Sequence, residues 1–240
     1  MRIAVVGANG FVGSEIANAV EKSNLHTLIR VIRGDDSDLL LKSADVVIHA
    51  ANPAGRFAAN NDNEKDFLET VEKTARLLKS SLGKKFILIS SISCRTQIDV
   101  SYGRHRRACE LMALTQNATV VRLGPMFGGR RVADTLHDIL AGNRVYVASE
   151  TRYAYTDVSW SAKKILGCID KPSMILELLA SNSISLAEIS NFFRSETEYL
   201  GPDDTQVSQE ENDGPDARLV LEFGQNELDR MRRAPKNNAL

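Results

Sequence analysis

Three side chains near the middle of the chain have the types and spacing for proton transfer at a carbonyl group. Tyr102 and Arg106 stand four residues apart in a segment of helical periodicity, so their side chains share one helix face. Ser91 directly follows the apolar run FILIS. A tyrosine beside a fixed cation can exchange a proton near neutral pH, and a neighbouring hydroxyl can hold a carbonyl oxygen. The three residues suit hydride transfer between a nicotinamide ring and a carbonyl or carbinol carbon. The alternative is a tyrosine that only packs at the edge of the core.

A glycine-rich turn at the start of the chain is suited to bind the cofactor of such a reaction. The turn follows an apolar run, opens a helical pattern, and reads Gly7-Ala8-Asn9-Gly10-Phe11-Val12-Gly13. Gly7 permits the tight turn, Gly10 lets a pyrophosphate approach the backbone, and Gly13 lets the helix pack closely on the sheet. The phosphates then meet free N–H groups at the positive end of the helix. The pattern predicts dinucleotide binding, and a structural turn without a ligand is the alternative.

The residues after the second apolar run bear on which dinucleotide binds. An acidic residue there would bond the ribose 2′-hydroxyl, whereas arginine suits a 2′-phosphate. The chain offers Arg30 and Arg33 and has no acidic residue before Asp35. We expect NADP or NAD, with NADP slightly favoured through one of the arginines, and Asp35 or Asp36 at the adenine edge. The alternative is that both arginines are solvated surface residues.

Short apolar runs alternate with helical patterns through the first two thirds of the chain. The expected strands cover residues 2–6, 26–32, 45–50, 85–90 and 118–123, and the expected helices include 11–21 and 102–114. Parallel neighbours need crossover helices, so this alternation predicts an α/β protein with a doubly wound parallel sheet, the Rossmann class. Residues 1–150 are predicted to form this dinucleotide-binding domain.

The last third of the chain has a different pattern. Residues 151–194 are predicted to form a small, reduced substrate lobe interleaved with the first domain, with a short strand at 175–179 and a serine-capped helix at 185–193. Residues 195–216 carry eight acidic and no basic side chains, which predicts a mobile segment. Residues 217–240 are expected to form a tail, with a strand at 218–223 and a short basic helix after it.

Composition excludes several classes of protein. The chain has 240 residues and a net charge of −1, which gives no electrostatic reason to expect nucleic acid or an anionic membrane as a partner. No apolar run approaches the length of a transmembrane helix, and the start does not resemble a signal peptide. Three scattered cysteines and four isolated histidines give neither a disulfide framework nor metal-ligand spacing. We therefore expect a cytoplasmic protein without a metal.

Longer stretches resemble the extended short-chain dehydrogenase/reductase family, the NAD-dependent epimerase/dehydratase group. They are VVGANGFVGSEIA at the glycine turn, DVVIHAAN at the family's fourth strand, and ILISSIS with YGRHRRACE around the serine and tyrosine. RLGPMFG, RYAYTDVSWSAKKIL and LELLASNSISLAEI resemble later family segments. The resemblance covers about residues 1–193 and implies an NAD(P)-dependent oxidoreductase of nucleotide-sugar metabolism.

The resemblance also implies roles for individual residues. Tyr102 becomes the proton donor or acceptor and Ser91 its hydroxyl partner, while Arg106 replaces the family's lysine. Arginine still supplies charge and donors but cannot release a proton, so it is not a neutral exchange for lysine. Arg130 and Arg131, after a Gly-Gly turn, are candidates for gripping a diphosphate. The residues implied to contact the cofactor are Gly7, Asn9, Gly10, Phe11, Val12, Gly13, Ala50, Ala51 and Pro125.

These observations lead to one expected function and two alternatives. We expect reduction of a 4-keto-sugar in nucleotide-sugar metabolism, with Tyr102 protonating the carbonyl oxygen. The alternatives are a nucleotide-sugar epimerase with tightly bound NAD, and a non-catalytic dinucleotide-binding sensor or scaffold. Family similarity also makes a homodimer plausible through the helices around residues 67–82 and 102–114.

Overall fold

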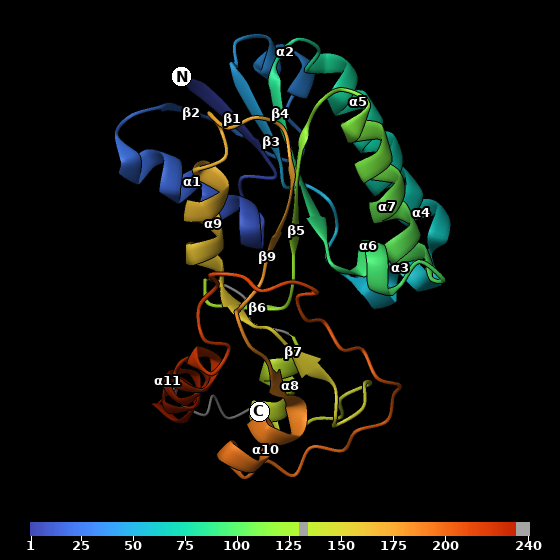
Figure 1. Ribbon diagram of the computed structural model, residues 1–240, viewed down its shortest axis with the longest axis vertical. Coiled ribbons are helices and arrows are strands. Elements are labelled where there is room, and N and C mark those ends of the chain that lie inside the picture. Colours follow the sequence, from blue (N-terminus) through green and yellow to red (C-terminus); the bar gives the residue numbers. More distant parts are fainter. Residues whose placement is uncertain (130–133, 234–240) are drawn as a thin grey trace, which may run out of the picture. The chain divides into compact units, whose positions relative to one another are not determined.

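Six apolar runs form one parallel sheet in the computed structural model, which describes residues 1–129 and 134–233 (Figure 1). The sheet has the strand order β2-β1-β3-β4-β5-β9. Its strands are β1 (Arg2–Val6), β2 (Thr27–Val31), β3 (Val46–His49), β4 (Lys85–Ser91), β5 (Thr119–Leu123) and β9 (Ile175–Leu178). Because β2 and β3 flank β1 on opposite sides, the order reverses between β1 and β3. Ligands of open α/β sheets bind at the carboxyl ends of the strands beside such a reversal.

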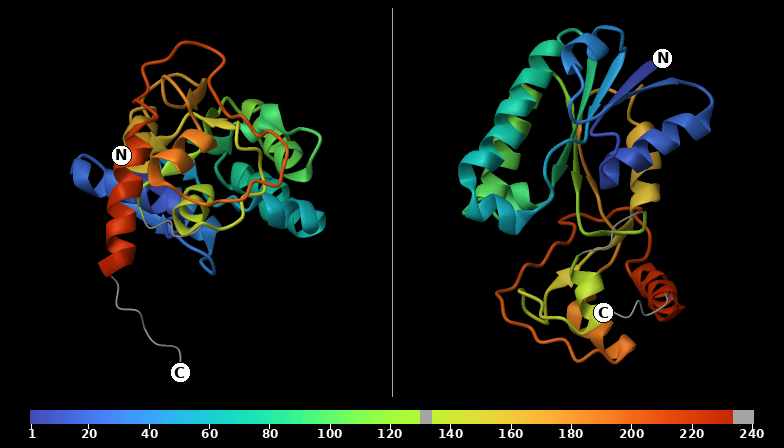
Figure 2. Two further views of the ribbon diagram at one scale, coloured as in Figure 1. Left: turned by 90° about the horizontal axis from the view of Figure 1, so that it is seen from below. Right: turned by 180° about the vertical axis from the view of Figure 1, so that it is seen from behind.

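Helices cover both faces of this sheet, which confirms the doubly wound α/β class (Figures 1 and 2). One face carries α1 (Phe11–Ser23) and α9 (Val158–Leu166). The other carries α2 (Ser37–Lys42), α3 (Arg56–Asn61), α4 (Asn63–Phe67), the π-helical turn η1 (Leu68–Glu72), α5 (Lys73–Ser80), α6 (Ser93–Thr96) and α7 (Ser101–Leu114). The stretch that resembles the family's fourth strand is the third strand of this chain, β3.

The inner strands of the sheet are buried, as continuous apolar runs in a parallel sheet require, whereas the edge strands β2 and β9 are largely half-buried or exposed. All four residues of β3 are buried, and so are four of the five residues of β1. Between the sheet and the helices α5 and α7 lies an apolar cluster that includes Val47, Leu77, Leu88 and Val120. This packing fixes the strand ends from which the candidate site is built.

The chain divides into two compact units, and the sheet belongs to the first, residues 1–123 and 158–178. The second unit comprises residues 124–157 and 179–240. Its described elements are β6 (Met126–Phe127), α8 (Thr135–Ala141), β7 (Arg152–Tyr153), β8 (Thr156–Asp157), β10 (Ile184–Ser185), α10 (Leu186–Phe193) and α11 (Leu219–Arg233). The strand β6 pairs with β8, and β7 pairs with β10. The predicted assignment of residue ranges to a cofactor domain and a substrate lobe stays a prediction.

The serine-capped helix near residue 185 is present in the second unit, with a reciprocal cap. The Ser185 hydroxyl accepts the backbone N–H of Glu188, and the Glu188 carboxylate accepts the backbone N–H of Ser185. This capping box satisfies two donors that a helix start leaves without partners. The serine cap was predicted from the sequence, and the returning bond from Glu188 was not.

The expected strand at residues 218–223 is wrong, because these residues begin helix α11 (Leu219–Arg233). The buried residues of this helix are Val220, Gly224 and Glu227, which recur at intervals of three and four and therefore lie on one helical face. The helix begins with the apolar run Leu219-Val220-Leu221, and a run this short does not distinguish a strand from part of a buried helix. The buried face of the longer helix decides between the two.

The acidic segment, residues 195–216, follows an extended path with specific hydrogen bonds. The N–H of Val145 donates to Glu198 O at 2.9 Å, and the N–H of Leu200 donates to Val145 O at 3.0 Å. The Tyr153 hydroxyl donates to the buried Asp204 carboxylate at 2.6 Å. Pairing with neighbouring backbone therefore holds part of a segment whose composition offers little apolar surface. Its mobility stays a prediction.

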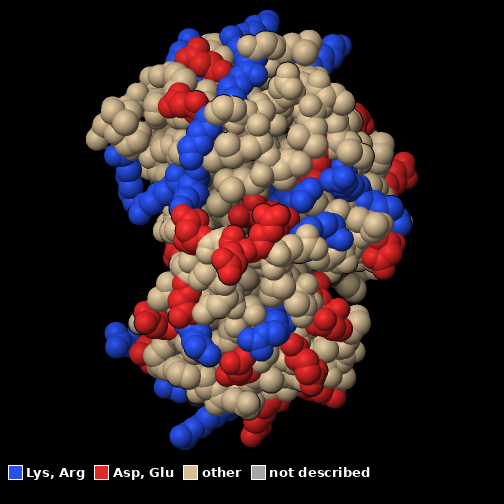
Figure 3. Space-filling view, viewed as in Figure 1, with Lys and Arg blue, Asp and Glu red and all other residues tan. Residues whose placement is uncertain are grey.

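Charged side chains of both signs are interspersed on the face shown in Figure 3. Among the helices that the structure describes, none is long and apolar enough to cross a membrane.

Candidate functional site

The glycine turn after β1 has a geometry that only glycine permits at two positions. Gly7 has φ of 86°, and a Cβ added to it would lie 2.8 Å from the carbonyl oxygen of Ala50. A Cβ on Gly13 would lie 2.1 Å from the carbonyl oxygen of Gly7. Both distances are shorter than any tolerable contact, so larger residues would push α1 and the end of β3 away from the turn. The first and third glycines therefore shape the turn as the sequence predicted.

The start of α1 presents its backbone donors without a competing side chain. Gly10 is the N-cap and makes no side-chain cap, and the first turn holds no acidic residue. The first bond of the helix joins the N–H of Ser14 to the carbonyl of Gly10 at 2.9 Å. Asn9 is exposed, and Phe11 and Val12 are half-buried. The helix dipole and these donors favour a phosphate at this position.

The charged residues in the last part of β2 and in the turn after it differ in what they can offer a cofactor. Arg30 is paired with Glu21 of α1 at 3.0 Å. Asp35 accepts the backbone N–H of Ile32 at 2.8 Å, so its carboxylate closes the turn. Arg33 has 90% of its side chain exposed and reaches Glu69 only at 3.8 Å. Of the two predicted arginines, Arg33 is therefore the one that can turn toward a ligand at little cost.

His49 organises the backbone at the end of β3. It is fully buried, and its Nδ1 accepts the N–H of Ala51 at 3.3 Å. The proton is therefore on Nε2, which lies 3.1 Å from Thr74 Oγ1. Burial, with the charges of Lys73 and Arg106, lowers the pKa of His49 to about 3, so the ring is neutral at physiological pH.

The predicted cofactor contacts Ala50 and Ala51 follow this histidine directly. The N–H of Ala50 donates to the carbonyl of Val6 at 2.9 Å, which joins the ends of β1 and β3. Both alanines are half-buried and lie against Gly7. The structure thus brings them beside the glycine turn.

Ser91, Tyr102 and Arg106 come together at the carboxyl end of β4. Ser91 is the last residue of the strand, and the other two lie one turn apart on α7. The guanidinium carbon of Arg106 lies 4.6 Å from the centroid of the Tyr102 ring. Burial opposes ionisation of Tyr102, but the charge of Arg106, with contributions from Arg56 and the Ser91 hydroxyl, lowers its pKa below the ordinary value. The phenol is therefore prepared for proton transfer.

Arg106 is held from one side and offers a donor on the other. It is only 3% exposed, and its Nη2 donates to the carbonyl of Pro53. Its Nη1 is buried and has no hydrogen-bond partner within the described residues. A buried donor without a partner costs free energy, which a ligand acceptor would restore. The glycine turn and this donor fit a bound dinucleotide, since they supply a phosphate cradle and a donor for a ribose hydroxyl.

Three residues that the sequence reasoning missed set the position of Tyr102. Asn60 Oδ1 accepts the backbone N–H of Tyr102 at 3.4 Å, and Asn63 Oδ1 accepts the Ser101 hydroxyl at 2.6 Å. Gly103 is the third, because a Cβ there would lie 2.0 Å from the carbonyl of Gln97. Only ten residues connect Ser91 to Tyr102, and the backbone of this connection packs directly against α7 at Gly103. The short connection was the sequence feature from which a glycine requirement could have been predicted. The two asparagines left no signal in the sequence.

Other candidates lie elsewhere or outside the description. Pro125 belongs to the second unit, where its carbonyl accepts the N–H of Thr156 at 3.1 Å. Arg130 and Arg131 lie outside the described residues. Within residues 1–129 and 134–233, no group of three or more His, Cys, Asp or Glu side chains could hold a metal ion. Burial raises the pKa of the Cys94 thiol to about 12, which leaves it unreactive.

A family comparison covers the first part of this site. Residues 3–97 match the model of the NAD dependent epimerase/dehydratase family. Residues 3–97 belong to this family. The matched segment holds the glycine turn, the end of β3 and Ser91, whereas Tyr102 and Arg106 lie beyond it. Over these residues the expected resemblance to the NAD-dependent epimerase/dehydratase family is confirmed.

Solved structures extend the likeness in fold to nearly the whole chain. MoeE5 in complex with UDP-glucose and NAD has a TM-score of 0.80 at 18% identity, covering 98% of this chain and 99% of that chain. UDP-glucuronic acid 4-epimerase from Bacillus cereus has a TM-score of 0.78 at 17% identity, covering 97% and 99%. The dTDP-4-dehydrorhamnose reductase from Bacillus anthracis, in complex with NADP, has a TM-score of 0.76 at 13% identity, covering 94% and 99%. At these identities the likeness establishes the fold.

No curated protein matches the sequence. The solved structures of similar fold include both epimerases and reductases, so they do not select one reaction. The family model that residues 3–97 match is NAD dependent, and this match does not specify the reaction.

Proposed function

We propose that this protein reduces a 4-keto-sugar carried on a nucleotide, using NADPH or NADH. The observation that carries the proposal is the grouping of Ser91, Tyr102 and Arg106 at the carboxyl end of β4, in the same unit as the glycine turn. A phenol with a lowered pKa, a hydroxyl and a fixed cation are the groups that carbonyl reduction requires. The cofactor, when bound, supplies the hydride.

In this mechanism Tyr102 donates its phenolic proton to the carbonyl oxygen as the carbonyl carbon accepts hydride. The C=O π bond breaks, a C–H and an O–H bond form, and a phenolate remains on Tyr102. Solvent returns the proton to Tyr102 before the next turnover. The Ser91 hydroxyl holds the carbonyl oxygen in line with the phenol.

Arg106 has an electrostatic role and a binding role in this scheme. Its charge stabilises the Tyr102 phenolate, and its unpaired Nη1 is the donor proposed to hold the nicotinamide ribose. A guanidinium stays protonated in proteins, so Arg106 cannot pass its own proton to Tyr102. The scheme therefore assigns proton return to solvent.

The nucleotide-sugar substrate is supported by similar structures. MoeE5 was solved with UDP-glucose, and the Bacillus cereus enzyme is named as a UDP-glucuronic acid 4-epimerase. The proposal for NADP rests on Arg33, whose exposed guanidinium can pair with a 2′-phosphate. A homodimer and a cytoplasmic location remain predictions.

Turnover of external cofactor tests the proposed reaction. The purified chain is mixed with NADPH or NADH and a UDP- or dTDP-linked 4-keto-sugar, and oxidation of the nicotinamide is followed by its near-ultraviolet absorbance. A reductase consumes the cofactor in proportion to sugar product. Interconversion of sugar epimers without net cofactor oxidation would replace this proposal with the epimerase. Cofactor binding with neither reaction on any tested sugar would favour the non-catalytic alternative.

A further inference from the structure

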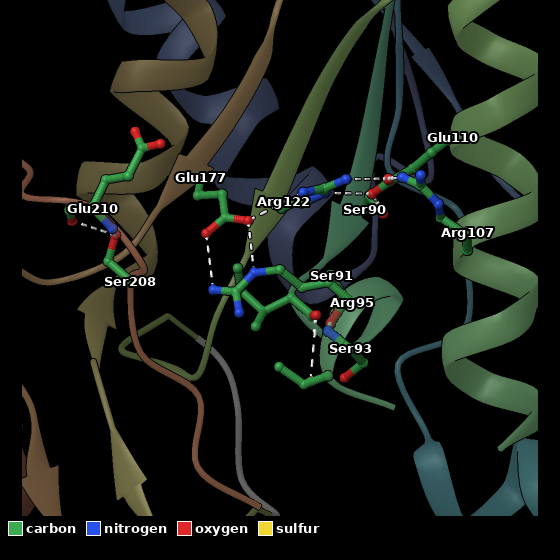
Figure 4. A network of polar contacts seen from close by, with 12 residues as sticks. Ser90, Ser91, Ser93, Arg95, Arg107, Glu110, Arg122, Glu177, Ser208 and Glu210 are labelled. Carbon is green, nitrogen blue, oxygen red and sulfur yellow. Dashed lines mark hydrogen bonds and ion pairs between the residues drawn. The ribbon is translucent and has the colours of Figure 1, made fainter. Parts of the chain in front are cut away.

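A row of polar side chains crosses three strands on the face of the sheet that α7 covers. Ser90 of β4 is in register with Arg122 of β5, which is in register with Glu177 of β9. Neighbouring strands lie about 4.8 Å apart, so these side chains are adjacent on one face. Figure 4 shows the row and the carboxylate of Glu110 that meets it from α7.

Glu110 is fully buried and has partners on both carboxylate oxygens. Its Oε1 accepts the Ser90 hydroxyl at 2.7 Å and Arg122 Nε at 3.0 Å, and its Oε2 accepts Arg122 Nη2 at 2.7 Å. Arg107 Nη1 is 3.3 Å from Oε2. Burial opposes the charge, but hydrogen bonds from Arg122, Cys94 and Ser90 outweigh it and lower the pKa of Glu110. The carboxylate is therefore ionised at neutral pH.

The row continues to the turn that follows Ser91. Arg122 Nη1 donates to Glu177 Oε1 at 3.2 Å. Arg95 of α6 forks onto the same carboxylate, with 2.9 Å to Oε1 and 3.0 Å to Oε2. The backbone N–H of Ser93 donates to the Ser91 hydroxyl at 3.2 Å. Ser90, before Ser91, and Arg95, in the helix after it, are thus joined through Glu110, Arg122 and Glu177 into one network of polar contacts (Figure 4).

The same cluster also fixes the position of Tyr102. Tyr102, Arg106 and Glu110 recur every four residues and share one stripe of α7, with exposures of 7%, 3% and 0%. Glu110 bonds the hydroxyl of Ser90, the residue before Ser91. A single carboxylate therefore connects the strand that carries one reactive hydroxyl to the helix that carries the other. A helix that slides or rotates by about 1 Å can cost on the order of a hundredfold in rate.

We propose that Glu110 is a positioning residue, which through Ser90 and Arg122 sets the separation and alignment of the Ser91 and Tyr102 hydroxyls. Glu110 acts through these neighbours and donates no proton to the reaction. This inference rests on the proposed function, since it assumes that Ser91 and Tyr102 act together.

The main test is Glu110→Gln, which keeps the side-chain shape and removes the charge. We expect NADPH affinity near the wild-type value, because the glycine turn lies on other elements, and kcat at least about tenfold lower with little change in KM. Arg106 and Ser91 lower the pKa of Tyr102 only while they are aligned with its hydroxyl, and the variant should disturb that alignment. Arg56 of α3 also lowers this pKa but is not expected to compensate for the loss. The ionisation of the Tyr102 phenol should therefore occur at higher pH in the variant. It is measured as the ultraviolet absorbance difference between proteins with Tyr102 and with Tyr102→Phe, once with Glu110 and once with Glu110→Gln.

Two serine variants and one control separate positioning from general damage. Ser90→Ala keeps every charge and should lower kcat in the same direction but less, and Ser90→Thr should restore it. This pair decides the question if Glu110→Gln fails to fold, as loss of a buried charge partner can cause. Asp66→Asn is the matched control, because Asp66 is another buried carboxylate bonded to α7, 2.6 Å from His105 Nδ1. It should leave kcat and the phenol titration unchanged.

The outcomes distinguish this inference from the proposed function. Wild-type kcat and wild-type Tyr102 titration in Ser90→Ala, or in a folded Glu110→Gln, would overturn the positioning role. An equal shift in Asp66→Asn would also overturn it, because any disturbance of α7 would then suffice. Absence of turnover in the wild-type protein would instead contradict the proposed function, and the phenol titration would still decide the role of Glu110.

Discussion

The guanidinium of Arg106 stacks on the ring of Tyr102, with 4.6 Å between the guanidinium carbon and the ring centroid. Arg106 stands at the position where the family resemblance implies a lysine. Arg106 is anchored on the carbonyl of Pro53 while Nη1 stays unpaired. A lysine ammonium is a compact charge without a planar fork, so it could not hold both positions in this way. The arginine is therefore fitted to its surroundings, and the site is built around it.

Substitution of Arg106 should change the pH dependence of the reaction. Reduction needs the protonated phenol, so its rate falls as pH rises through the pKa of Tyr102. Arg106→Met removes the cation that lowers this pKa, and the falling limb should move to higher pH, with kcat/KM reduced by about a hundredfold or more. The check is kcat/KM for 4-keto-sugar reduction across pH. A limb that stays in place would show that Arg106 does not act on Tyr102.

Arg106→Lys gives a sharper test of the same contact. We expect lower kcat/KM than the wild type, because lysine keeps the charge and loses the fork that bonds Pro53 and offers Nη1 together. A gain of activity would mean that arginine is a degenerate replacement, and it would support a protein that has lost catalysis.

Alanine at Gly13 should destroy the cofactor turn. The added Cβ would lie 2.1 Å from the carbonyl oxygen of Gly7, and overpacking of this kind costs about 1–3 kcal/mol or more in unfolding free energy. Gly55→Ala is the matched control, because its Cβ would meet Ala58 at an ordinary 3.5 Å. Thermal melts should show a lower melting temperature, and fluorescence titrations weaker NADPH binding, in Gly13→Ala but not in Gly55→Ala. Equal behaviour of the two variants would refute the role of the turn.

Cofactor preference should depend on Arg33 more than on Arg30. Arg33 is 90% exposed and has only a long, 3.8 Å contact with Glu69 to give up for a 2′-phosphate, whereas Arg30 is held by Glu21 at 3.0 Å. Arg33→Ala should weaken NADPH binding about tenfold, the equivalent of one charge-assisted hydrogen bond, and leave NADH binding unchanged. Arg30→Ala serves as the control and should change neither. Tighter binding of NADH than of NADPH to the wild type would contradict a 2′-phosphate site at Arg33.

The buried neutral His49 should make stability fall in mild acid. Its pKa is about 3 in the folded state and near 6.5 when unfolded, so between these values the unfolded chain binds more protons and is favoured as pH falls. The contribution to the unfolding free energy between pH 7 and pH 5 is about 2 kcal/mol. Urea unfolding of wild type and His49→Gln at both pH values measures it. The variant should lose less stability than the wild type on acidification, and equal losses would contradict the buried neutral state.

Local signals made much of the fold predictable. The glycine turn, the first five strands and the capped helix at Ser185 each follow from residues that are neighbours in sequence. The strand expected at 218–223 was wrong because the short apolar run at 219–221 gives no information about the long buried face of α11. A periodicity over all fifteen residues of that helix would have been the better guide.

The site was only partly predictable for a related reason. Ser91, Tyr102 and Arg106 were found from residue type and spacing. The cluster around Glu110 depends on the registers of β4, β5 and β9, which bring together residues up to 87 positions apart, from Ser90 to Glu177. His49 was given no chemistry, and its structural role appears only when Thr74 of α5 is seen beside it.

Hydride transfer itself is tested most directly with an isotope. NADPH dideuterated at C4 of the nicotinamide is incubated with the wild-type protein and a UDP- or dTDP-linked 4-keto-sugar, and the product is analysed by mass spectrometry. The account predicts one deuterium on the sugar carbon in the wild type, and almost no product from Tyr102→Phe although that variant still binds NADPH. Undiminished labelled product from Tyr102→Phe, or reduced sugar without deuterium, would contradict it.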